Sequence, residues 1–375
     1  MRLTIERRLD QPRWLAVVVP VLSVAVALVI AAVVMLATGH NPLSSYRKLV
    51  DAAFLQTGSI GQTLIAATPL AFTGLAAAVA FRMQLFNIGG EGQLYFGTVG
   101  AAAAALVLGN TATPLLVVAM ILAGALCGAL WAAIPGLLRA FLKTNEIITS
   151  LMLNYVAGLI ITYLIFDSHS YWRASAGFEA SVFPQGKDLP THSNWWTFGT
   201  HTVVPFGFVL AAILALLLWI LYTRTRFGFE VKVIGDSWRA ARYAGMRTGR
   251  KIVAVMMLSG AIAGIGGASQ DGDFRHLLDP KGVTAAGYGY TGIVVAALGR
   301  YNPFSVVVVA FLIGGLQNAG YALQGADFPA GLVGVMQGLI LFCALGGELL
   351  VRYRIRIARR PRAAEPEPVG RAEVA

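Results

Sequence analysis

Asn87-Ile88-Gly89-Gly90-Glu91-Gly92-Gln93 is a polar, glycine-rich stretch between two membrane-like segments of this chain. Mostly apolar residues fill 70–81 before it and 94–108 after it. A carboxylate and two amides inside hydrocarbon cost free energy unless they face protein or water. Three glycines beside them favour a broken helix, which a membrane tolerates only where the helix is buried in protein or lines a cavity. The stretch therefore predicts a helical membrane protein with an interrupted helix beside a solute path.

The composition excludes an ordinary soluble protein. Of the 375 residues, 57% are hydrophobic and 13% are charged, whereas soluble domains carry about 25% charged residues. The net charge of +11 would suggest nucleic acid in a soluble chain. Here the enrichment of Lys and Arg on the inner side of membranes explains it, so we expect no nucleic-acid partner.

Runs of roughly 20 apolar residues predict ten membrane spans in an all-α, polytopic protein. The eighth run is short and glycine-rich, so we expect it to be broken or re-entrant. The predicted spans are 14–37, 60–81, 88–108, 114–138, 147–166, 204–222, 252–269, 285–299, 304–321 and 330–350.

The distribution of positive charge predicts the orientation of these spans. With the N-terminus in the cytoplasm, 23 of the 29 Lys and Arg residues fall in inner segments and 6 in outer segments. This bias is typical of membrane proteins, so we expect both termini to be cytoplasmic.

The same pattern predicts three divisions of the chain and two long loops. We expect a cytoplasmic segment at 1–13, a transmembrane domain at 14–351 and a basic, disordered tail at 352–375. The arginines of the tail are suited to anionic membrane lipids. Residues 167–203 form an outer loop rich in aromatic residues, and residues 223–251 form an inner loop.

Motifs for catalysis or energy conversion are missing from the sequence. The chain has no GxxxxGK[ST] phosphate loop, since Gly245-Met-Arg-Thr-Gly249-Arg-Lys lacks both its spacing and its hydroxyl. It also has no HExxH helix and no serine in a nucleophile elbow. We therefore expect no catalytic residues, no metal site and no cofactor in this chain.

Polar residues within the spans are the candidates for solute contact. We select Asn87, Glu91, Gln93 and Asn154 as residues that line the path. Glu91 accepts hydrogen bonds from a solute, or it caps a neighbouring half-helix N-terminus, where negative charge is favoured. A polar but uncharged lining suits a neutral, hydrogen-bonding solute.

A short inner helix is predicted between Gly235 and Gly245, with Asp236 or Ser237 as its N-cap. Its small face consists of Ala240, Ala241 and Ala244, while Arg239 and Arg242 point elsewhere. A small-faced helix fits a groove of a soluble partner, and the alternative is a helix that rests on lipid headgroups.

Three pairs of glycines with GxxxG spacing permit close approach of helix backbones, and we expect them to pack within the chain. They are Gly124 with Gly128, Gly260 with Gly264, and Gly334 with Gly338.

These features together resemble the permease subunit of a bacterial ABC importer of the simple-sugar and nucleoside branch, related to branched-chain amino acid and ribose permeases. The resemblance extends over about 14–350. The motifs that carry it are Phe86-Asn-Ile-Gly-Gly-Glu-Gly-Gln93, Lys143-Thr-Asn-Glu-Ile-Ile-Thr-Ser-Leu-Met-Leu-Asn154, and Gly287-Tyr-Gly-Tyr-Thr-Gly-Ile293 with Leu298-Gly-Arg300.

The resemblance implies a multi-pass protein of the bacterial inner membrane that forms a path for nucleosides or a related sugar by alternating access. It implies a cytoplasmic ATPase that binds ATP and Mg, a second permease and an external substrate-binding lipoprotein. It also implies that the inner helix docks into the ATPase. The coupling residues are then Gly235, Asp236, Ala240, Ala241, Arg242 and Gly245.

Two other classes remain open. A self-sufficient secondary carrier would use ion gradients and would need more buried acids than Glu91. An intramembrane enzyme or assembly factor would need a nucleophile or a metal cluster in the spans. The solute is a purine nucleoside, a pyrimidine nucleoside or a sugar, and the permease pair consists of identical or different chains.

Overall fold

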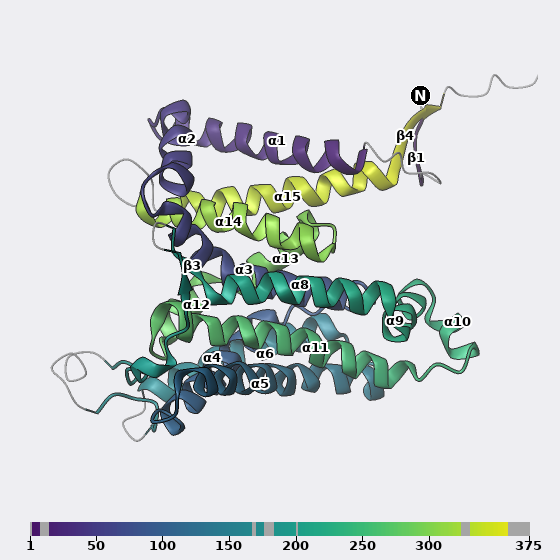
Figure 1. Ribbon diagram of the computed structural model, residues 1–375. Coiled ribbons are helices and arrows are strands. Elements are labelled where there is room, and N and C mark those ends of the chain that lie inside the picture. The colour runs from purple at the N-terminus through teal and green to yellow at the C-terminus, as the bar shows by residue number, and fades with distance from the viewer. Residues whose placement is uncertain are drawn as a thin grey trace, which may run out of the picture. The chain divides into compact units, whose positions relative to one another are not determined.

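The computed structural model describes residues 2–7, 15–166, 170–175, 184–199, 202–323 and 331–358, which are mostly helical (Figure 1). Residues 1, 8–14 and 324–330, parts of the expected outer loop at 167–203 and tail residues 359–375 lie outside this description. The long helices are α1 (Leu15–Ala37), α3 (Ser59–Phe81), α4 (Gly90–Val107), α5 (Thr113–Leu142), α6 (Glu146–Phe166), α8 (Phe206–Arg224), α11 (Thr248–Ser269), α14 (Pro303–Ala322) and α15 (Leu332–Arg352).

Shorter elements connect the long helices. The short helices are α2 (Pro42–Val50), α9 (Arg226–Asp236), α10 (Trp238–Tyr243), α12 (Pro280–Ala286) and α13 (Tyr288–Leu298), with π-helices η1 (Asp51–Leu55) and η3 (Gln270–Arg275) and the 3₁₀ helix η2 (Thr191–Ser193). The strands are β1 (Arg2–Arg7), β2 (Thr197–Phe198), β3 (Val204–Pro205) and β4 (Tyr353–Ala358).

Six helical segments in the described part of the chain are long and apolar enough to cross a membrane. They are α3, α5, α6, α8, α11 together with η3, and α14. Nine of the ten predicted spans coincide with a long helix to within a few residues. The eighth is broken, as expected, because Gly287 adopts a φ of +60° between α12 and α13.

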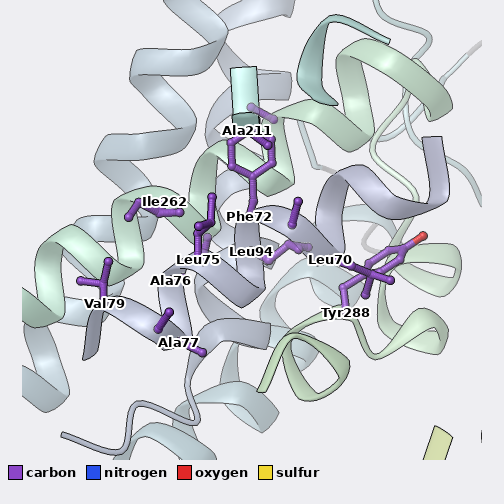
Figure 2. Packing of buried hydrophobic residues seen from close by; sticks show 14 of the residues in the cluster. Leu70, Phe72, Leu75, Ala76, Ala77, Val79, Leu94, Ala211, Ile262 and Tyr288 are labelled. Atoms are coloured by element: carbon purple, nitrogen blue, oxygen red, sulfur yellow. The ribbon is translucent and has the colours of Figure 1, made fainter. Parts of the chain in front are cut away.

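Helix α3 lies at the centre of the larger packed core. Figure 2 shows its Leu70, Phe72 and Leu75 among side chains from other helices, including Leu94 of α4 and Ile262 of α11. Most residues of α3 are buried, so this span faces protein rather than lipid along most of its length. The helix therefore forms a fixed wall against which α4, α11 and α13 pack.

Close glycine contacts join α5 to α11. A Cβ on Gly264 would overlap the carbonyl oxygen of Gly124, and a Cβ on Gly128 would overlap the carbonyl oxygen of Gly260. Intramolecular packing of these two pairs is thus confirmed. The third pair differs, because a Cβ on Gly334 or Gly338 would meet no atom within 4 Å.

Contacts divide the chain into two compact units, 1–30 with 339–375, and 31–338. In the first unit, β1 pairs antiparallel with β4, from Arg2 opposite Ala358 to Arg7 opposite Tyr353. The expected disordered tail is therefore wrong for residues 353–358. Their sequence Tyr-Arg-Ile-Arg-Ile-Ala alternates with period two, which is typical of a strand, but its arginines led us to assign it to a solvated basic tail.

In the second unit, the inner and outer elements separate along the helices. Helices α9 and α10 lie at one end, and β3 and α12 lie at the opposite end (Figure 1). The predicted inner loop at 223–251 and the predicted outer segment between 269 and 285 therefore lie at opposite ends of this unit.

Candidate functional site

The Asn87–Gln93 stretch lies at a break between two helices. Helix α3 ends at Phe81, residues 82–89 are not helical, and α4 begins at Gly90. Gln84 turns the chain with a φ of +56°. The predicted interruption is therefore present, and it brings polar side chains into the protein interior.

Two amides at this break bind each other reciprocally. The Asn87 amide nitrogen donates to the Gln93 side-chain oxygen at 3.0 Å, and the Gln93 amide nitrogen donates to the Asn87 oxygen at 2.9 Å. Asn87 also donates to Ser259 Oγ of α11 at 2.9 Å, and Ser259 donates to the Ala76 carbonyl of α3 at 2.7 Å. These bonds join the start of α4 to α11 and α3.

Glu91 caps the N-terminus of the short helix α13. Its Oε2 accepts from the backbone N–H groups of Gly289 and Tyr290, and its Oε1 accepts from the Tyr95 hydroxyl at 2.7 Å. The side chain is 1% exposed. A carboxylate at a helix N-terminus satisfies otherwise unpaired N–H groups and complements the helix dipole. The capping alternative thus describes Glu91 in this structure, although the helix it caps is α13 and not its own.

Asn154 joins α6 to the same place. Its oxygen accepts from the Gly92 N–H at 2.9 Å, and its nitrogen donates to the Ile88 carbonyl at 2.9 Å and to the Tyr290 hydroxyl at 3.3 Å. Because the side chain bonds to both sides of the break, it fixes the path of the chain there.

Glycine allows α4 and α13 to meet end to end. A Cβ on Gly289 would overlap the backbone of Glu91, and a Cβ on Gly92 would come within 3.0 Å of Asn154 and Trp131. Only a residue without a Cβ fits at Gly289, since backbone and not a flexible side chain fills the space.

We call this cluster of Asn87, Glu91, Gln93 and Asn154 the polar joint. All four predicted path residues belong to it, and each is less than 5% exposed and hydrogen-bonded within the chain. The adjacent Tyr290 is 41% exposed. The joint can therefore hold two helix ends in place, and Tyr290 provides its accessible surface.

Sequence reasoning missed two groups of residues. The first group is Gly289 and Tyr290, whose backbone N–H groups bind Glu91; apart from the glycines at 287 and 289, nothing in the sequence there indicated this contact. The second group is η3, where Asp271 is completely buried and Asp273 is partly buried. We had placed both acids in an outer loop, because the predicted span ended at 269, but the helical path continues to Arg275.

The predicted coupling residues belong to two helices rather than one. Gly235 and Asp236 end α9, and Ser237 caps α10 by accepting from the Ala240 N–H at 3.3 Å. Ala240 and Arg242, two of the predicted coupling residues, are exposed, whereas Ala241 is buried within the chain. Within the predicted small face, Ala241 therefore packs against its own protein, whereas Ala240 and Ala244 are exposed.

Gly235 has a different role from the one expected. A Cβ at this position would come within 2.7 Å of the Arg82 carbonyl oxygen and 3.2 Å of Met83. The end of α9 therefore lies directly on the turn that leads from α3 to the polar joint.

Comparison with known proteins gives a family and several relatives. A model of the family described as "Branched-chain amino acid transport system / permease component" matches residues 59–345. The glucose ABC transporter permease protein TsgB13 of Haloferax volcanii is 32% identical, with 99% of this chain and 98% of that protein covered.

Two relatives come from Lactococcus lactis subsp. cremoris. The nucleoside ABC transporter permease protein NupB is 31% identical, covering 93% of this chain and 96% of its own length. The nucleoside ABC transporter permease protein NupC is 28% identical, covering 72% and 83% respectively. The matched region includes every residue of the polar joint and of α9 and α10.

Proposed function

This chain belongs to the permease-component family of branched-chain amino acid transport systems, and we propose that it is the permease subunit of an ATP-driven ABC importer for nucleosides or a related simple sugar. The match over 59–345 carries the proposal. Relatives named as nucleoside and glucose ABC permeases support the solute class. The chain is a multi-pass membrane protein, and we place it in a bacterial inner membrane.

For topology, we propose ten crossings with both ends in the cytoplasm. Six helices meet the criteria for a span, and α1, α4, the broken pair α12 and α13, and α15 supply the others. The pairing of β1 with β4 supports an even number of crossings, because hydrogen-bonded strands must lie on the same side of the membrane. We retain 1–13, 14–351 and 352–375 as the divisions, with 353–358 as an ordered strand.

The polar joint is the wall of the translocation path in this proposal. Helix α13 has 11 residues, which is about 16 Å at 1.5 Å per residue. Its capped N-terminus therefore lies well within the roughly 30 Å of hydrocarbon. A buried half-helix end of this kind marks substrate sites in transporters. Asn87, Glu91, Gln93 and Asn154 position this end, and the exposed Tyr290 contacts the solute.

Coupling to ATP hydrolysis uses α10 and Gly235. We propose that the exposed side of α10, which includes Trp238, Arg239 and Tyr243, docks into a cytoplasmic ATPase. Movement of α9 would then reach the turn at 82–83 through the close contact at Gly235. That turn continues into the polar joint, so an inner event changes the solute path.

The remaining partners complete the importer. ATP and Mg belong to the ATPase, and this chain supplies no catalytic residue in the proposal. A second permease forms the other half of the path, and the two Lactococcus lactis relatives support a pair of different chains. An external lipoprotein delivers the solute to the outer loop, and membrane lipids surround the spans.

The experiment is uptake of labelled guanosine, uridine, ribose and glucose by cells that have the gene, by cells that lack it, and by complemented cells. We expect saturable uptake of at least one solute to disappear on deletion and to return on complementation. ATP depletion by arsenate should stop it even when ion gradients are kept. Uptake that survives deletion for all four solutes would contradict the proposal.

One observation favours the rival carrier, because Asp271 and Asp273 add buried acids that the sequence had not placed in a span. The arsenate arm separates the two mechanisms, since a secondary carrier keeps working on ion gradients alone.

A further inference from the structure

The outer end of α11 holds a concentration of buried polar atoms without partners. In the described part of the chain, seven of the ten buried side-chain nitrogen and oxygen atoms without a hydrogen bond belong to η3, its following residue and Trp195. They are Gln270 Oε1, Asp271 Oδ1, Asp271 Oδ2, Asp273 Oδ1, Arg275 Nε, His276 Nδ1 and Trp195 Nε1. Buried polar groups are normally paired, so this group requires a physical explanation.

Asp271 is the centre of the group. Its side chain is fully buried, and neither carboxylate oxygen has a donor among the described residues. The neighbouring cations do not supply one. Arg275 directs its guanidinium to Asp279, and burial lowers the pKa of His276, so the imidazole is neutral at pH 7. The two oxygens of the Asp271 carboxyl group are therefore buried polar atoms without hydrogen bonds among the described residues.

Asp273 is half satisfied. Its Oδ2 accepts from the Gly207 N–H at the start of α8, at 3.0 Å, and its Oδ1 has no donor in the described residues. With Gln270 and Asp271, it contributes the four unpaired oxygen atoms of the group.

The group is connected to the polar joint and covered by the outer loop. Helix η3 contacts α3 and α4, and Arg275 interacts with Tyr288 at the start of α13. The backbone N–H of Trp195 donates to the Gly272 carbonyl at 2.9 Å, and the Trp195 indole ring lies against Gly272. A displacement of this loop segment would open the acceptors to the outer side.

The chemistry of the set selects its ligand. The group contains four unpaired oxygen atoms and three unpaired nitrogen atoms, so its ligand must both donate and accept hydrogen bonds. No group of three or more His, Cys, Asp or Glu side chains in the described residues is arranged to hold a metal ion. Hydroxyl groups on a sugar ring can instead donate to these oxygens and accept from these nitrogens.

We propose that Asp271, with Gln270 and Asp273, forms a subsite on the outer part of the path that binds the vicinal hydroxyls of a ribose or hexose ring. The proposal rests on the importer function above and names the part of the solute that this chain recognises. Solute arrives when the segment with Trp195 moves away from Gly272, and it passes on toward Tyr288 and the polar joint.

The test compares the maximal uptake rates of guanosine and 2′-deoxyguanosine in cells with all native partners. Both solutes are supplied at saturating concentration, so that a difference in their affinities for the external binding protein does not affect the compared rates. We expect Asp271→Asn to lower the guanosine rate by about tenfold, which corresponds to the loss of about one buried hydrogen bond. The 2′-deoxyguanosine rate should fall less, because that solute lacks one of the two donors.

The matched control is Asp51→Asn, which removes an acid whose side chain is 41% exposed and should change neither rate. Membrane amounts of each variant are measured by immunoblot. Gln270→Leu removes an acceptor without changing charge, and it gives the same comparison if Asp271→Asn does not reach the membrane.

Two results would overturn the subsite. They are unchanged rates in both variants, and an equal fold decrease of the two rates, since Asp271 would then not recognise the hydroxyl group that distinguishes the two solutes. Failure of the importer function looks different, since uptake would then not depend on the chain at all.

Discussion

At the scale of single residues, Glu91 shows how one carboxylate can determine the position of a helix. It supplies an acceptor for two backbone N–H groups of α13 and for the Tyr95 hydroxyl. No other described side chain of the polar joint carries charge. These bonds hold α13 in place, so we expect Glu91 to affect transport even without a contact with solute.

We expect Glu91→Gln to lower uptake by about tenfold while the complex still assembles. Glutamine keeps one acceptor oxygen but directs an NH₂ group to the N–H groups of α13, and the loss of charge at a buried helix N-terminus costs up to about 2 kcal/mol. Initial uptake rates and co-purification of partners are the measurements. Glu230→Gln, which affects an ion pair with Lys251 near the inner end, is the control. Unchanged uptake would remove Glu91 from the mechanism.

The sequence predicted the members of the polar joint but not their bonds. Polar residues in an apolar context gave Asn87, Glu91, Gln93 and Asn154, because such residues are costly in a membrane. The partner of Glu91 is 198 residues away at Gly289, and a contact of that separation has no local pattern. Asp271 was missed for another reason, since its own charge ended the apolar run by which the span was recognised.

At the scale of helices, glycine determines which surfaces can meet. Helices α4, α5 and α11 approach one another at Gly97, Gly124 and Gly264 so closely that backbone atoms fill the space of a side chain. GxxxG spacing predicted two of these surfaces correctly. It did not predict that α5 packs against α11, because the spacing of glycines describes the surface of one helix and not the helix that packs against it.

Gly264→Ala should destabilise the assembled protein by about 1–3 kcal/mol, since the added methyl group overlaps the Gly124 carbonyl and forces the helices apart. Gly338→Ala is the matched control, because a Cβ there meets nothing within 4 Å. Thermal stability of the solubilised complex measures both. Equal losses would mean that the α5–α11 contact has no special role.

Gly245→Asp should reduce uptake strongly while the chain remains in the membrane. Gly245 has a φ of +75°, and its surroundings are open, so a side chain strains the end of α10 and projects a negative charge from the surface proposed to dock the ATPase. Co-purification of the ATPase and its stimulation by solute are the measurements. An ATPase that remains bound and responsive would show that α10 docks elsewhere.

At the scale of the whole molecule, the pairing of β1 and β4 constrains the topology without any count of spans. Residues 2–7 and 353–358 form one antiparallel ladder, so the first and last helices emerge on the same side. Hydropathy predicts spans from local composition, and positive charge predicts their direction. Neither predicts that two segments about 350 residues apart are hydrogen-bonded, since each strand is short and carries only its own period-two pattern.

Reporter fusions test this arrangement. A fluorescent protein joined to either end should fluoresce, and alkaline phosphatase joined to either end should be inactive, because we propose that both ends are cytoplasmic. A fusion of either reporter after Gly109 should behave in the opposite way, as an outer position. Opposite results at the two ends would be incompatible with the β1–β4 ladder.

The half-length of α13 has an electrical consequence. In the proposed path, water on either side of α13, which is about 16 Å long, would leave a thin insulating layer across which the membrane voltage falls steeply. A charge that moved through this layer would do work of about 2.3 kcal/mol per 100 mV, whereas an uncharged nucleoside or sugar would do none. Import of such a solute at constant ATP should therefore keep the same initial rate when an ionophore collapses the voltage.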